Sequence, residues 1–158
     1  MMGMDKDKDL TDALVHLIEG KADLAIDKAM LWKEEWVAKC IIFLSNSFFK
    51  YDPLTAMEIF GGKAGINKIM SSKCIERYFL QGFGGMFRKE MSNSETAFNS
   101  AAEILPNDPY IQFGRAFIYL KMGKIDELLG AVSAMGQKNA EHPLFFLLRD
   151  IVLDQKRS

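Results

Sequence analysis

The sequence has no surplus of charge of either sign. Its 158 residues include 20 Lys and Arg and 21 Asp and Glu, which gives a formal net charge of −1, and no run of basic residues occurs. A protein whose main partner is nucleic acid needs a basic surplus on one face to neutralise phosphates. We therefore expect no binding of nucleic acid.

Long apolar runs and cysteine pairs are also scarce. The longest apolar stretches, 41–44 and 143–153, are far shorter than the roughly 20 residues that a membrane-spanning helix needs. The N-terminal residues lack the apolar core of a secretory signal. Cys40 and Cys74 lie in apolar helical contexts without a CxxC neighbour, which is typical of buried, reduced thiols. These observations predict a cytoplasmic protein that does not insert into membranes.

Motifs for catalysis or metal binding are not found. Neither His16 nor His142 has a second histidine, a cysteine or paired carboxylates at ligand spacing,. Gly82–Gly85 resembles a fragment of a dinucleotide loop, but no strand is expected before it, and Gly61–Gly65 lacks the spacing of a phosphate loop,. We expect no enzymatic activity, no cofactor and no metal site.

The pattern that is present is helical periodicity. Leu10, Leu14 and Leu17 recur at the spacing of one helix face,, and similar spacing continues to the C-terminus without the strict alternation of a half-buried strand. The sequence predicts an all-α protein in which residues 61–73 form a frayed helix end and a loop. The helices are expected over about 10–18, 22–30, 34–50, 54–60, 74–90, 93–105, 109–122, 125–135 and 143–154.

Helix starts can be predicted from short polar signals. Asp52 before Pro53 and Asp108 before Pro109 are each typical of an N-cap followed by proline in the first turn. Ser92 or Asn93 is expected to cap the helix that runs to about residue 105. We expect a flexible N-terminal tail over residues 1–9, a single helical-repeat domain over 10–154 and a C-terminal tail over 155–158.

The C-terminal half repeats itself at a spacing of 34 residues, which is the period of the tetratricopeptide repeat (TPR),. At this spacing Pro109 aligns with Pro143. Residues 94–129 contain AxxxAxxxLPNDP, then the small residue Ala116, an aromatic residue and the turn glycine Gly123, and in this they resemble the TPR family. The further aligned pairs are Phe79 with Phe113, Phe83 with Phe117, and Gly82 with Ala116.

The TPR resemblance implies a fold and a binding surface. The fold is a right-handed α-solenoid of three to four helix pairs plus a C-terminal helix, and its concave side would hold a protein or peptide partner. The sequence departs from the family where Lys89 replaces the turn glycine and where Arg115 occupies a usually apolar place. Eight residues are expected to line the partner-binding groove, or alternatively to be packed in the core: Phe79, Phe83, Met86, Phe87, Tyr110, Phe113, Phe117 and Leu120.

A narrower resemblance concerns the bacterial type III secretion chaperones of the TPR class. Residues 76–91 are similar to the aromatic-rich first helix of the chaperones for translocators, and residues 109–154 resemble the smaller needle-subunit co-chaperones. The resemblance implies a chaperone that keeps an apolar or amphipathic segment of a secreted substrate soluble. The alternative is a structural scaffold, for example a homodimer, that self-associates through the apolar C-terminal helix, where only Arg149 and Asp150 are charged between Leu144 and Leu153.

Overall fold

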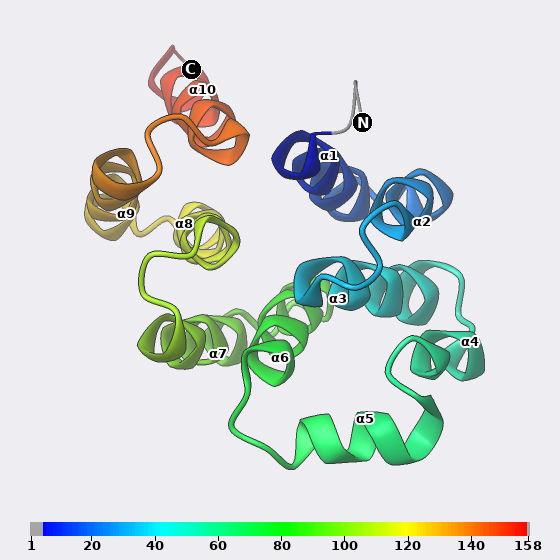
Figure 1. Cartoon of the computed structure of the whole chain (residues 1–158). Helices are drawn as coiled ribbons and strands as arrows, with labels where there is room; N and C mark the ends of the chain where they lie inside the picture. Colours follow the sequence, from blue (N-terminus) through cyan, green and yellow to red (C-terminus); the bar gives the residue numbers. More distant parts are fainter. Residues whose placement is uncertain (1–4, 158) are drawn as a thin grey trace. The chain divides into compact units, whose positions relative to one another are not determined.

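The computed structural model describes residues 5–157, and this part of the chain is helical without any strand (Figure 1). The all-α prediction is therefore confirmed. The helices are α1 (Lys6–Ile18), α2 (Ala22–Met30), α3 (Trp36–Leu44), the π-helical turn η1 (Ser45–Phe49), α4 (Pro53–Glu58), α5 (Gly62–Met70), α6 (Ile75–Phe87), α7 (Met91–Ile104), α8 (Pro109–Met122), α9 (Ile125–Lys138) and α10 (Pro143–Arg157).

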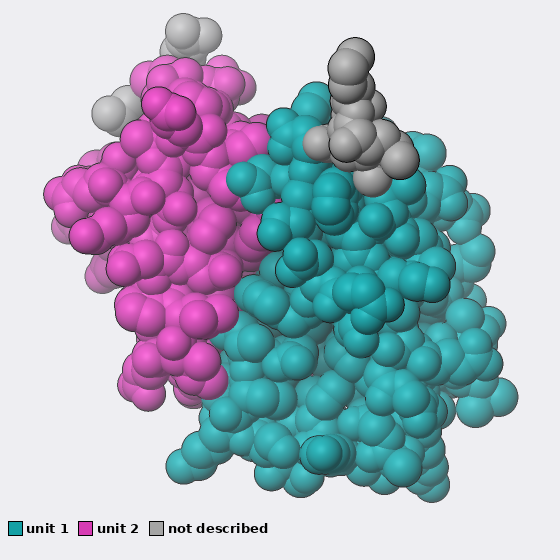
Figure 2. Space-filling view, in the orientation of Figure 1, with its two compact units in different colours: residues 1–80 teal, residues 81–158 magenta. Residues whose placement is uncertain are grey.

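The chain divides into two compact units, residues 1–80 and residues 81–158 (Figure 2). Helix α6 begins in the first unit and ends in the second.

The ends of the chain are more helical than the sequence analysis expected. Helix α1 begins at Lys6, and the Asp5 carboxylate accepts the backbone N–H of Lys8 at 3.2 Å as an N-cap. Four residues of the expected tail, 6–9, therefore belong to a helix, while 1–4 lie outside the described residues. Helix α10 runs to Arg157, so the expected tail from 155 is helical up to that residue, and Ser158 lies outside the described residues.

The two Asp-Pro helix starts are confirmed. The side chain of Asp52 accepts the Thr55 N–H at 3.1 Å, and that of Asp108 accepts the Tyr110 and Ile111 N–H groups at 2.9 and 3.1 Å. Such a cap contributes about 1 kcal/mol because it satisfies amide groups that the first turn leaves unpaired.

The cap expected at Ser92 or Asn93 was wrong. Helix α7 begins earlier, at Met91, and Glu90 stands at the cap position without a side-chain hydrogen bond. The next serine, Ser94, is buried and its hydroxyl donates to the Gly82 carbonyl at 2.6 Å. Ser94 thus forms a hydrogen bond with helix α6 and does not cap α7.

The loop expected over residues 61–73 was also wrong, because helix α5 occupies 62–70 of it. Gly61 and Gly62 have φ angles of 92° and 84°, so both glycines serve the turn before the regular part of the helix, where a positive φ favours glycine. Gly65 lies within α5, where a side chain would collide with the Phe60 carbonyl. The buried side chain of Ile66 then anchors the helix.

The first unit is built around the apolar face of α1. This helix packs against α2 and α3, while α4 packs against α3, η1 and α5 (Figure 1). Leu10, Leu14 and Leu17 are buried at the expected helical spacing, and burying each leucine contributes roughly 1.5–3 kcal/mol. At the polar edge of this core, the Trp32 indole N–H donates to the Asp9 carboxylate at 3.0 Å.

The second unit is built around α8, which packs against α7, α9 and α10. The ring of Phe98 on α7 is fully buried, and a Cβ atom added at Gly82 or at Gly114 would overlap it. Phe83 packs edge-on against the same ring, with ring centroids 5.0 Å apart. The absence of a side chain at the two glycines thus lets α6 and α8 approach this aromatic ring closely.

Candidate functional site

Most of the predicted groove residues are buried. Phe79, Phe83, Met86, Tyr110 and Phe113 are each at most 6% exposed. Each aromatic member of this set has a packing partner in its own unit: Phe79 lies edge-on to Trp36, Phe83 to Phe98 and Tyr110 to His142, while Phe113 stacks on Phe117.

The other three predicted residues, Phe87, Phe117 and Leu120, are partly exposed. Phe87 contacts Phe83 along α6, and the Lys121 ammonium lies 5.4 Å from the centre of the Phe117 ring. A partner can therefore touch only these three residues directly in this structure. The five buried residues are placed as the alternative of core packing expects.

An accessible hollow of about 570 Å³ lies elsewhere, in the first unit. We call it the α2–α4 trough. Residues of α2, α3, η1 and α4 form its walls, together with residues 33, 50 and 59 from the segments that follow α2, η1 and α4. None of these residues belongs to the predicted groove. Its lining residues are Asp23, Ile26, Asp27, Met30, Lys33, Ile42, Asn46, Lys50, Thr55, Glu58 and Ile59.

Helical spacing explains how the sequence builds the trough. On α2 the lining residues are 23, 26, 27 and 30, which recur at the interval that forms one stripe along a helix. A separate stripe of α2, 22, 25 and 29, consists of buried alanines. Because the small alanines take the packing side, the larger Ile26 and Met30 are left on the open side.

The π-helical turn η1 contributes to one wall. The Lys50 N–H bonds to the Ser45 carbonyl at 3.2 Å, five residues back, and the Asn46 amide donates to the Ile42 carbonyl at 3.1 Å. Asn46 and Ile42 both line the trough. Insertions of this kind into helices are found frequently at functional sites.

The trough combines an apolar floor with charged edges. Ile42 is buried, Ile26 and Ile59 are half-buried, and Met30 is 45% exposed. A ligand that covers such side chains gains roughly 25 cal/mol per Å² of apolar surface removed from water.

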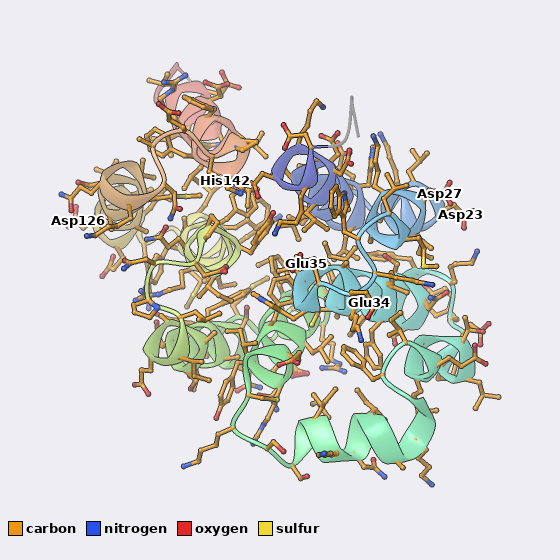
Figure 3. All side chains as sticks on the ribbon, in the orientation of Figure 1. Asp23, Asp27, Glu34, Glu35, Asp126 and His142 are labelled. Carbon is orange, nitrogen blue, oxygen red and sulfur yellow. The ribbon has the colours of Figure 1, made fainter. Side chains whose placement is uncertain are left out.

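The charges at the edge of the trough are only partly paired. The Lys50 ammonium bonds to the Asp23 carboxylate at 2.6 Å, and this hydrogen bond raises the pKa of Lys50. Asp27 and Glu58 form no ion pair with any other described residue. Figure 3 shows Asp23 and Asp27 on the same side of α2. Two carboxylates are thus available to a cationic group of a ligand.

The sequence contains a signal for the trough. Ile26 and Met30 lie four residues apart. Asp27 follows Ile26 directly and lies one turn before Met30, and a separate stripe of the same helix consists of alanines. The predicted binding surface followed the repeat register, on the first helix of each pair, and therefore did not include α2. The register selects helices that carry large aromatic residues, and most of the residues predicted there are buried.

The titratable groups in the core have structural roles. Burial raises the pKa of the Cys40 thiol well above its ordinary value, so this cysteine stays protonated, and it is not in a disulfide,. Burial also raises the pKa of Asp108, opposed by its hydrogen bonds from the Ile111 and Tyr110 amides. Its carboxylate is engaged in capping α8.

Within residues 5–157, no group of three or more His, Cys, Asp or Glu residues is placed to hold a metal ion. None of the helices there has both the length and the apolar character to cross a membrane.

Comparisons with known proteins identify no relative of this chain. Protein-family models, curated proteins and solved structures were each compared with this chain, and none matches it.

Proposed function

We propose that this protein is a TPR-like protein-binding module that holds an apolar or amphipathic segment of a partner protein. In the second unit α8 packs against α7 and α9, and it also packs against α10, which begins 34 residues after the start of α8 at the second aligned proline,. Gly123 adopts a left-handed conformation with φ of 73° at the turn between α8 and α9. These features support a helical-repeat arrangement within the second unit.

The observation that carries the proposal is the α2–α4 trough. A hollow of about 570 Å³ with an apolar floor is large enough to accept several side chains of a bound segment. The unpaired carboxylates of Asp27 and Glu58 favour a segment that carries lysine or arginine beside its apolar residues. An amphipathic helix with basic residues flanking its apolar stripe has both properties.

The resemblance of residues 76–91 and 109–154 to type III secretion chaperones makes a secreted substrate the first partner to examine. Such a substrate would be held in the cytoplasm before export. The proposed contact surface differs from the aromatic groove that the resemblance implies, because Phe83 and Phe113 are buried and Met30 is accessible.

The test is a binding titration of a fluorescent, lysine-containing amphipathic helical peptide with the full chain and two variants. The double variant Met30→Asp, Ile59→Asp places charge on the apolar floor and is expected to weaken binding at least tenfold. Leu54→Ser is the matched control, because Leu54 is 72% exposed on α4 but does not line the trough. Equal affinity of all three proteins would reject the trough as the binding site.

Self-association through α10 is a second candidate function. Leu144, Leu148 and Val152 on this helix are buried, while Phe146 and Leu153 are about 40% exposed. The Arg149 guanidinium covers part of the Phe146 ring at 5.2 Å. Sedimentation of the full chain and of a Phe146→Ser, Leu153→Ser variant distinguishes the candidates, because a wild-type monomer excludes this one.

A further inference from the structure

A second, smaller hollow lies in the second unit between α8 and α9, beside the turn that precedes α8. Its volume is about 150 Å³, and we call it the Arg115 hollow. Arg115 and Lys138 are its two charged residues, and no carboxylate is among the described residues that line it. The lining residues are Pro106, Asn107, Gln112, Arg115, Ala131, Ala134, Gln137 and Lys138.

Arg115 is the residue of this hollow that packing does not explain. It is half-buried in the middle of α8. Its guanidinium donates one hydrogen bond, from Nη2 to the Tyr119 hydroxyl at 3.3 Å, and its Nε atom is buried without a hydrogen-bond partner. Arginine has five N–H donors and always carries its charge.

No described carboxylate neutralises this guanidinium, since Arg115 forms no ion pair within residues 5–157. Partial burial of a charge without an anion costs free energy that apolar packing would not cost. An anion that enters the hollow would remove this cost. Lys138 differs, because a cation in the last turn of α9 is already favoured by the helix dipole,.

Side-chain amides complete the surroundings of Arg115. The Asn139 amide donates to the Gln112 Oε1 atom at 2.7 Å and to the Asn107 carbonyl at 2.8 Å. The Gln112 Oε1 atom accepts the hydrogen bond from Asn139. The Gln112 NH₂ group is therefore the part of this side chain that can donate a hydrogen bond to a ligand. A guanidinium, an ammonium and amide N–H groups are the donors that bind oxyanions.

We propose that the Arg115 hollow is a binding site for a small oxyanion, a carboxylate or a phosphate group. The volume of about 150 Å³ is large enough to admit one such group. The charged residues of this hollow are both cationic, which selects an anion, whereas carboxylates and ammonium groups both line the α2–α4 trough. This inference does not rest on the proposed protein-binding function.

The test is an NMR titration of the full chain with inorganic phosphate and, in a separate series, with acetate. Sodium chloride keeps the ionic strength constant, so that general screening of surface charge does not vary. Binding predicts saturable shifts of the Arg115 Nε–H signal and of the Gln112 side-chain amide. The series that saturates at the lower concentration identifies the preferred oxyanion.

Three variants test whether the anion binds in the Arg115 hollow. Arg115→Gln is expected to weaken binding at least tenfold, and Lys138→Gln to weaken it less, because Lys138 is exposed to water,. Arg149→Gln is the control, since Arg149 lies on α10 and does not line the hollow, and it should leave binding unchanged.

The proposal is overturned if neither anion gives saturable shifts in the wild type, or if Arg149→Gln weakens binding as much as Arg115→Gln. Circular dichroism shows whether each variant folds. Should Arg115→Gln fail to fold, the wild-type Arg115 Nε–H shift and the Lys138→Gln affinity decide the question. An Nε–H signal that does not move with either anion is then the contrary result.

Discussion

The aromatic cluster around Phe98 and the α2–α4 trough are both apolar surfaces on helices, but one is sealed and the other is open. In the cluster, Gly82 and Gly114 provide room for the Phe98 ring, so the neighbouring helices close over it. In the trough, the open side of α2 carries Asp23 and Asp27 beside Ile26 and Met30. The neighbours of an apolar residue therefore decide whether it is buried or accessible. Glycines on the adjacent helices let the Phe98 ring be buried, whereas aspartates on the same face of α2 leave Ile26 and Met30 accessible to a ligand.

The largest effect is expected from removing the sealed ring. Phe98→Ala leaves a cavity among buried side chains and should lower the free energy of unfolding by about 3–5 kcal/mol. Phe146→Ala is the control, because Phe146 is 40% exposed and its truncation should cost about 1 kcal/mol or less. Urea denaturation measures both. A loss below about 1 kcal/mol for Phe98→Ala would show that the cluster is not packed as described.

The second effect concerns the glycines that make the cluster possible. Gly114→Val should lower the free energy of unfolding by about 1–3 kcal/mol, because the new side chain would overlap the Phe98 ring,. Gly130 in α9 faces open space, with nothing within 4 Å of an added Cβ atom. Gly130→Ala should therefore increase stability by up to about 1 kcal/mol through helix propensity.

A double-mutant comparison sharpens this prediction. In the Phe98→Ala background the clash no longer exists, so Gly114→Val should cost clearly less than it does in the wild type. The same cost in both backgrounds would contradict a direct contact between this glycine and the ring.

The smallest effect compares two turns. Lys89 has a φ of 64°, in the same left-handed region as Gly123 with its φ of 73°, although only glycine adopts it without strain. Lys89→Gly should thus raise the free energy of unfolding by about 0.5–1 kcal/mol, since the relief of strain exceeds the entropy cost of glycine. Thermal denaturation measures the change, and a lower melting temperature would contradict it.

Local features of the fold could be predicted from the sequence, and tertiary features could not. The caps at Asp52 and Asp108 depend on neighbouring residues alone, so the Asp-Pro pattern was sufficient. The helix α5 was missed because glycine was interpreted as a helix breaker, whereas Gly61 and Gly62 lie in the turn that begins it. Departures from the repeat pattern were informative: Lys89 has the backbone conformation of a turn glycine, and Arg115 lines a hollow.

The candidate site could be predicted only in part, because exposure depends on which helix covers which. Phe83 and Met30 are both large apolar residues at helical spacing, and the sequence does not distinguish their exposure. The first is fully buried against Phe98, and the second is 45% exposed. Helical spacing identifies residues that share a face, but the approach of the next helix decides whether that face is accessible.

The central claim is that a partner segment binds in the α2–α4 trough and not on the sealed aromatic cluster. Methyl NMR of the full chain during titration with the lysine-containing amphipathic peptide tests it directly, because Met30 is exposed in the trough and Met86 is buried on α6. The account predicts that the methyl signals of Met30, Ile26 and Ile59 shift with the peptide while that of Met86 stays in place. A shift of Met86 with no change at Met30 would contradict it.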